Sequence, residues 1–200
     1  LYGLWENREQ IRKADSIVLV EGELDVIPSW QVGVKNVAAI KGSAFTNDQA
    51  QLMTRFTKNV IMSLDSDSAG QEAIKRAVVI AENLDMSIRV VQITGGKDPG
   101  DVATTNARSW KEMVGKAVLY WDFLIDSALT RNDPKTGAGA SAISSEVIPA
   151  LSQIANSVMR AHYVSDLAKK LKVPEESIYS EIERTNKRKE LNILKQTASS

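Results

Sequence analysis

The sequence predicts an α/β fold over its first 130 residues, a mostly parallel sheet flanked by helices, followed by a small all-helical subdomain. Over those residues, short β-branched runs alternate with stretches of helical periodicity. Such alternation with short connections favours parallel strands with helices on both faces. Beyond residue 140 the apolar residues recur at spacings of three and four, which is typical of helices.

The elements of the first region follow from these patterns. Ile17-Val18-Leu19-Val20 is a continuous apolar run, the pattern of a strand buried on both faces. Further strands are expected over residues 36–40, 59–64 and 87–93. Helices are expected over residues 24–32, 46–56, 68–83, 107–114 and 117–129, and a polar loop over residues 94–101.

Residues 131–140 mark a predicted domain boundary, because they contain a proline, two glycines and almost nothing apolar. We expect a first domain over residues 1–130, a linker over 131–140, a helical subdomain over 141–190 and a frayed tail over 191–200. The helices of the subdomain are expected to bury Ile143, Val147, Leu151, Ile154 and Val158, then Tyr163, Leu167 and Leu171, and finally Ile178 and Ile182.

Composition narrows the function classes. The 25 acidic and 25 basic side chains cancel, which argues mildly against a dedicated nucleic-acid-binding domain, since such domains are usually basic. Cysteine is absent, which excludes disulfides, thiol catalysis and zinc ribbons. A cytoplasmic setting fits this composition, and no apolar run approaches the length of a membrane span.

Acidic clusters follow three of the expected strands. Glu21-Gly22-Glu23-Leu24-Asp25 follows the first, Asp65-Ser66-Asp67 the third, and Asp98-Pro99-Gly100-Asp101 the fourth. Ligands of open α/β sheets bind beyond the carboxyl ends of the strands, and oxygen ligands without His or Cys suit Mg²⁺ or Mn²⁺. An isolated Asp-x-Asp is more often a helix cap, but three clusters at one edge favour a metal site.

These motifs are similar to those of a known family. Val20-Glu21-Gly22-x-x-Asp25 and Leu64-Asp65-x-Asp67-x-Ala69-Gly70 resemble the two Toprim motifs, and Gly96-Lys97-Asp98-Pro99 resembles a third acidic motif. The lead-in Leu1-Tyr2-Gly3-Leu4 and the stretch Gly42-Ser43-Ala44-Phe45-Thr46 resemble bacterial DNA primases in particular. Residues 158–168 resemble the helical subdomain that follows in those primases, so the resemblance covers nearly the whole chain.

The resemblance implies roles for named residues. Glu21 would be an acid/base or metal ligand at the reacting 3′-hydroxyl, and Asp25 a supporting catalytic residue. Asp65, Asp67 and Asp98 would join Glu21 in holding Mg²⁺ or Mn²⁺, with two ions expected. Lys97 would offset phosphate charge. The implied reaction is synthesis of short RNA primers from ribonucleoside triphosphates on single-stranded DNA.

The chain departs from the family pattern at three places. Gly100 stands where a second acid is usual, with Asp101 one place later; Glu23 stands at a commonly aromatic position, and Lys41 at a commonly apolar one. The zinc ribbon, the basic subdomain and the helicase-binding domain of bacterial primases are not expected within these residues. We therefore expect contact with the replicative helicase through a domain absent here, and weak priming by this chain alone.

Two other functions compete with this interpretation. A Toprim fold can also carry nuclease chemistry, in which DNA is shortened rather than RNA made. Separately, residues 167–178 loosely resemble a helix-turn-helix, which reads DNA through its second helix. That second helix is rich in glutamate, which opposes phosphate approach, so a packing hairpin is favoured over a DNA reader.

Overall fold

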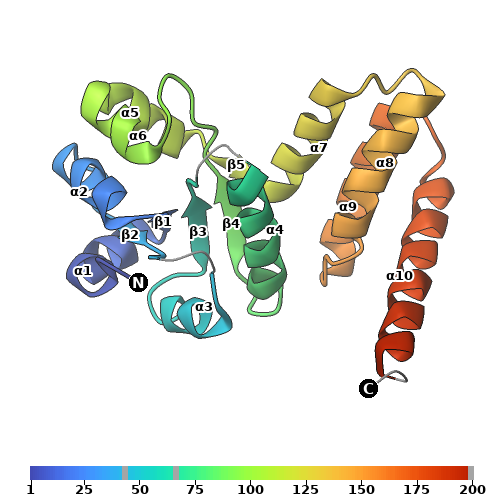
Figure 1. The fold of residues 1–200 in the computed structure, drawn as a ribbon, viewed down its shortest axis with the longest axis horizontal. Helices are drawn as coiled ribbons and strands as arrows, with labels where there is room; N and C mark the ends of the chain where they lie inside the picture. Colours follow the sequence, from blue (N-terminus) through green and yellow to red (C-terminus); the bar gives the residue numbers. More distant parts are fainter. Residues whose placement is uncertain (42–44, 65–67, 198–200) are drawn as a thin grey trace. The chain divides into compact units, whose positions relative to one another are not determined.

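The computed structural model describes residues 1–41, 45–64 and 68–197, and gives the backbone alone for residues 68, 69, 71, 189 and 192–197. The chain divides into two compact units, Leu1–Tyr120 and Trp121–Ser200. Unit 1 is the α/β part and unit 2 is helical, so the predicted fold class is confirmed (Figure 1).

Among the described residues of unit 1, five strands form one sheet in the order β2-β1-β3-β4-β5. The strands are β1 (Ile17–Val20), β2 (Val37–Ala39), β3 (Asn59–Met62), β4 (Ser87–Val90) and β5 (Val118–Leu119). The first four are parallel, and β5 pairs antiparallel with β4. The four predicted strands are therefore present, whereas β5 begins the segment that was predicted to be a helix over residues 117–129.

Helices cover both faces of the sheet. They are α1 (Leu4–Ala14), α2 (Glu23–Gln31), α3 (Asn47–Met53), α4 (Ser68–Glu82), α5 (Pro99–Thr105) and α6 (Ala107–Gly115). The crossovers β1–α2–β2 and β3–α4–β4 run in opposite directions across the sheet, so the usual right-handed connection places α2 and α4 on opposite faces. Helices α5 and α6 lie on the α2 side, because α5 packs against both α2 and α6.

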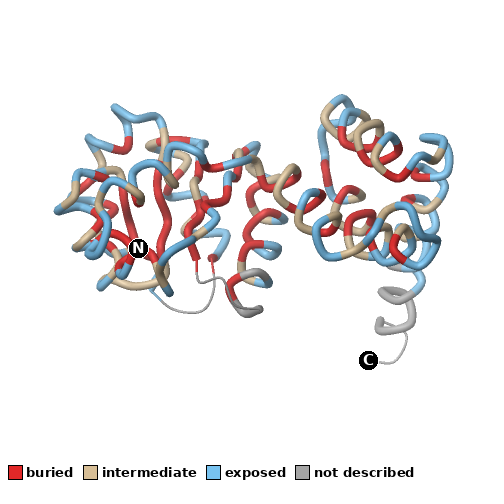
Figure 2. Tube along the Cα trace, turned by 90° about the horizontal axis from the view of Figure 1, so that it is seen from above, coloured by how far each residue is buried: buried red, intermediate tan, exposed pale blue. Residues whose placement is uncertain are grey.

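The core of unit 1 lies between the sheet and these helices, as the buried strand segments in Figure 2 show. Every residue of β1 is buried. Val18 and Val20 join a cluster with Val26 of α2, Val102 of α5 and Trp110 of α6. Because strand side chains alternate, Ile17 and Leu19 fill the opposite face, which explains the continuous apolar run in the sequence.

Two helices of unit 1 were not predicted. Helix α1 begins after an antiparallel bridge between Tyr2 and Ala39, which covers the outer edge of β2. Helix α5 occupies the end of the segment predicted as a polar loop, and it begins where Asp98 accepts a hydrogen bond from the Asp101 amide. Helix α1 is mostly polar and α5 has only seven residues, so tertiary packing supplies much of their stability.

Unit 2 contains α7 (Tyr120–Arg131), α8 (Gly137–Leu151), α9 (Ser157–Leu171) and α10 (Glu175–Thr197). Its buried residues include all the predicted ones except Val158, which is 78% exposed. Val158 lies in the first turn of α9 after a break at residues 152–156, so it does not continue the apolar face of α8. Ile154 is buried within that break.

The division between the units lies earlier than the predicted linker. Trp121 contacts the Tyr163 ring, Asp126 pairs with Lys170, and Arg131 pairs with Glu146, so α7 packs with α8 and α9. The short segment before α8 is thus a turn inside unit 2, and residues 137–140 are helical. Helix α10 continues to Thr197, although a frayed tail was expected from residue 191.

Candidate functional site

The strand order has a switch point between β1 and β3, where ligands bind in open α/β sheets. Leu19 is in register with Met62, and the Ser63 amide donates to the Leu19 carbonyl at 2.8 Å. Glu21 follows β1 directly, and Leu64 reaches the same level beyond β3. Asp65 comes next in the sequence, but Asp65 and Asp67 lie outside the described residues.

Glu21 lies half-buried at this carboxyl edge. Its carbonyl oxygen accepts a hydrogen bond from the Lys41 amide at 3.1 Å, which joins the end of β1 to the end of β2. The site residue predicted from the first motif is therefore at the switch point, on a backbone held from one side by β2.

Asp25 joins two helix starts. Its Oδ2 accepts from the Gly22 amide at 3.1 Å, at the start of α2, and its Oδ1 accepts from the Gly100 amide at 3.1 Å, at the start of α5. Burial raises the pKa of Asp25, the two amides oppose that shift, and the charge of Asp98 adds to it. Each oxygen of Asp25 thus accepts one backbone hydrogen bond, and the carboxylate links the starts of α2 and α5.

Asp98 and Asp101 cap α5. Asp98 Oδ1 accepts from the Asp101 amide at 2.7 Å, and Asp101 Oδ2 accepts from the Lys97 amide at 3.2 Å. One oxygen of Asp101 is therefore turned back onto the Lys97 amide. The Lys97 residue is exposed.

Gly100 fits where a larger residue would not. A Cβ at this position would lie 2.9 Å from Asp25 Oδ1 and 3.2 Å from the Leu24 carbonyl oxygen. The departure from the family pattern at this position thus coincides with a close approach between α5 and α2.

Glu23 and Lys41, the other two residues that differ from the family pattern, contact each other. Lys41 Nζ lies 3.4 Å from Glu23 Oε1, with 65% and 42% of the two side chains exposed. The pKa of Glu23 is lowered, first by a hydrogen bond from its own amide and then by the Lys41 charge. In the sequence, each of these residues is a separate departure from the family pattern, and no local pattern indicates that they form an ion pair.

A divalent metal is implied at this edge by the motifs. Within residues 1–41, 45–64 and 68–197, no group of three acidic or histidine side chains converges as a metal site. The donors present are nevertheless of the right kind, since Glu21 after β1 and the Asp98 oxygen that does not cap α5 are hard carboxylate ligands. These residues fit Mg²⁺ provided that the Asp65 and Asp67 segment completes the set.

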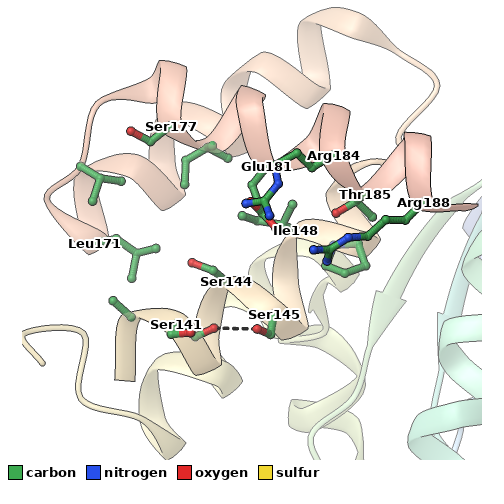
Figure 3. A pocket seen from close by; sticks show the side chains of 14 residues that line it. Ser141, Ser144, Ser145, Ile148, Leu171, Ser177, Glu181, Arg184, Thr185 and Arg188 are labelled. Carbon is green, nitrogen blue, oxygen red and sulfur yellow. Dashed lines mark hydrogen bonds and ion pairs between the residues drawn. The ribbon is translucent and has the colours of Figure 1, made fainter. Parts of the chain in front are cut away.

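Unit 2 has a groove of about 550 Å³ between α8 and α10 (Figure 3). Small residues of α8, among them Ser141, Ser144 and Ser145, face Arg184 and Arg188 of α10 across it. Ile148 and Ile178 are buried at its floor. The acidic first turn of α10 (Glu175, Glu176) is exposed, which supports the packing hairpin rather than the helix-turn-helix.

The tryptophans split into two classes. Trp110 and Trp121 are buried, whereas Trp5 is 67% exposed and Trp30 is 45% exposed. The Arg8 guanidinium lies over the Trp5 ring and the Lys35 ammonium over the Trp30 ring. Trp5 and Trp30 are therefore not core residues, and each lies against a basic side chain. None of the described helices is long and apolar enough to cross a membrane.

Family comparisons match both units. Residues 18–103 match the family described as Toprim-like, and residues 122–176 match the DnaB-helicase binding domain of primase. The second match overlaps α7, α8 and α9, so a segment similar to a helicase-binding domain lies within this chain, contrary to the expectation that it would be absent.

Named relatives agree with these matches. A DNA primase of Halalkalibacterium halodurans is 32% identical over 196 residues, which are 93% of this chain and 33% of the relative. The chain spans about a quarter to a third of the length of the curated relatives that it matches.

Solved structures are also similar. A DNA primase domain from Pseudomonas aeruginosa has a TM-score of 0.75 at 26% identity, over 90% of this chain and 58% of that one. A DnaG primase catalytic domain bound to single-stranded DNA has a TM-score of 0.72 at 27% identity, over 88% of this chain and 57% of that one. The two family matches, the named relatives and the similar structures all point to one family. The chain belongs to the bacterial DnaG-type primases.

Proposed function

We propose that this chain is the catalytic core segment of a DNA primase, which joins ribonucleotides into short RNA primers on single-stranded DNA in the bacterial cytoplasm. The observation that carries the proposal is the placement of Glu21 at the β1/β3 switch point, level with the end of β3. The likeness to a primase domain bound to single-stranded DNA supports the choice of template.

Glu21, Asp65, Asp67 and Asp98 would hold Mg²⁺ or Mn²⁺, with two ions proposed. Bound divalent ions lower the pKa of the attacking hydroxyl and stabilise charge on the triphosphate. Glu21 would accept the proton of the primer 3′-hydroxyl at its carboxylate. Its backbone is held by the hydrogen bond from the Lys41 amide to the Glu21 carbonyl, and two residues earlier by the bond from the Ser63 amide to the Leu19 carbonyl.

Asp25 would act as a positioning residue. It ties the start of α2, which follows Glu21, to the start of α5, which carries Asp98. Asp25 would thereby help to orient the segments that carry two proposed ligands, Glu21 after β1 and Asp98 at the start of α5. Lys97, exposed beside Asp98, would contact the substrate phosphates.

The metal site is tested by titrating Mn²⁺ into the wild-type chain and into Asp65→Asn/Asp67→Asn, with water-proton relaxation as the readout. We expect saturable binding that the double variant loses. Asp85→Asn is the control, because Asp85 is an exposed acid that precedes β4 at the amino edge, and asparagine accepts its left-handed backbone. Equal binding by all three proteins would exclude the proposed site.

Product analysis separates the two Toprim chemistries. Labelled ribonucleotides incorporated on a single-stranded template indicate a primase, whereas shortened template indicates a nuclease. We expect RNA synthesis, and loss of that synthesis in Asp65→Asn/Asp67→Asn.

A second proposed function is contact with the replicative helicase through unit 2, which the match of residues 122–176 favours. Val158 is the position to change, because it is apolar, 78% exposed and within that match. We expect Val158→Lys to weaken binding to a DnaB-type helicase in a polarisation assay, and Val79→Lys on the exposed side of α4 to leave it unchanged. Equal effects of the two variants would argue against unit 2 as the contact.

A further inference from the structure

Lys41 is a cation placed directly beside the proposed catalytic residue. Its amide nitrogen donates to the Glu21 carbonyl at 3.1 Å, so the two residues are neighbours on adjacent strand ends. Its backbone is left-handed, with φ of 51°, a conformation that costs a residue with a Cβ about 1 kcal/mol. The sheet edge thus turns sharply at a lysine, where glycine or asparagine would fit with less strain.

The side chain of Lys41 is exposed yet held in place. It is 65% exposed, and its Nζ lies 3.4 Å from Glu23 Oε1 at the start of α2. An ion pair this open contributes little to stability. Its geometric effect is larger, since Glu23 restrains a long, flexible ammonium over the carboxyl edge instead of leaving it free in solvent.

We propose that Lys41, restrained by Glu23, is a triphosphate-binding residue of the nucleotidyl-transfer site. A nucleotide bound at a cluster of carboxylates brings several negative charges toward other negative charges, and metal ions offset only part of that repulsion. Lys41, whose backbone adjoins Glu21, supplies a positive charge with three N–H donors, which suits phosphate oxygens. The inference rests on the proposed function, because it assumes a nucleoside triphosphate as substrate.

The test is calorimetric titration of Mg²⁺-loaded ATP and of Mg²⁺-loaded inorganic triphosphate into the full chain. Lys41→Met is expected to lower the binding affinity for both ligands by about five- to tenfold, the size of one exposed charge-assisted contact. Lys58→Met is the matched control. Lys58 is also an exposed lysine paired with an acid, Asp85 at 3.8 Å, but it precedes β3 at the opposite edge of the sheet.

A double variant separates phosphate contact from simple charge neutralisation. If Lys41 binds phosphate, Glu23→Gln/Lys41→Met stays at least about threefold weaker than wild type, while Glu23→Gln alone binds no more weakly than about twofold. If Lys41 only neutralises Glu23, removing both charges restores wild-type affinity, and the proposal is overturned. Unchanged binding in Lys41→Met overturns it as well.

Mn²⁺ titration of the same proteins distinguishes this proposal from the broader one. Lys41→Met is expected to bind Mn²⁺ like wild type, since the lysine is not a metal ligand. If the wild type binds neither Mn²⁺ nor triphosphate, the proposed function itself fails. If it binds Mn²⁺ but Lys41→Met loses no triphosphate affinity, only the role of Lys41 is wrong.

Discussion

Asp25 Oδ1 lies 3.1 Å from the Gly100 amide nitrogen, although 75 positions separate the two residues in the chain. The same carboxylate accepts from Gly22 with its other oxygen. One half-buried side chain thus links the start of α2, which follows Glu21, to the start of α5, which Asp98 caps.

Gly100→Ala is expected to destabilise unit 1 by about 1–2 kcal/mol. Its Cβ would meet Asp25 Oδ1 at 2.9 Å and the Leu24 carbonyl oxygen at 3.2 Å, and overpacking of this kind costs more than the helix propensity that alanine gains. Urea unfolding followed by circular dichroism measures the change. Gly115→Ala at the end of α6 is the control, because its Cβ would meet nothing within 4 Å. A lower free energy of unfolding in both variants would point to backbone effects instead of the Asp25 contact.

Gly139→Ala is expected to destabilise unit 2 by about 3 kcal/mol, at the upper end of overpacking costs. The added Cβ would lie 2.0 Å from the Asp133 carbonyl oxygen, so the turn before α8 must move. Gly137→Ala, two residues earlier, meets nothing within 4 Å and is expected to stabilise the helix by up to about 1 kcal/mol. The unfolding temperature should fall in Gly139→Ala and rise in Gly137→Ala. A shift in the same direction in both variants would contradict the predicted clash with Asp133.

Glu21→Gln is expected to weaken Mn²⁺ binding and to reduce primer synthesis by at least about 100-fold, the usual contribution of a catalytic acid or base. Glu112→Gln is the control, because Glu112 is a glutamate on α6 whose side chain pairs only with Arg108 among the contacts described. Retained synthesis in Glu21→Gln, with metal still bound, would remove Glu21 from the chemistry.

Tyr163 should give unit 2 an alkaline sensitivity. Burial raises the pKa of Tyr163 to about 12, with help from the charge and hydrogen bond of Asp122 and the charge of Asp166. The neutral phenol is favoured in the folded state, so its stabilising contribution is complete below pH 10 and is lost as pH rises through about 12. In Tyr163→Phe we expect a flatter fall in unfolding free energy between pH 10 and 12, by about 1–2 kcal/mol.

Absorbance at 295 nm gives the direct measurement for Tyr163. The chain has four tyrosines, and the one that titrates near pH 12 should be missing from the Tyr163→Phe curve. Titration of all four near pH 10 in the wild-type chain would show that Tyr163 is not held in the buried, acid-facing environment seen here.

Periodicity in the sequence was enough to predict the α/β class, the four parallel strands and the burial of residues such as Val18, Leu19 and Ile143. Local patterns suffice there because burial on one or both faces of an element repeats along the chain itself. The acidic motifs also predicted which edge of the sheet carries the candidate site, since parallel strands end together. The roles of Asp65 and Asp67 stay a prediction.

Only the tertiary structure decided how the site is assembled. The bond from Gly100 to Asp25 and the pair between Lys41 and Glu23 join segments brought together by chain crossovers, which no local window of sequence contains. The same holds for α1, which is mostly polar, and α5, which is short, since packing on β2 and α2 stabilises them. Sequence by itself therefore determined the fold class and the residue types of the predicted site, while contacts between distant segments determined which of their oxygens accept backbone hydrogen bonds.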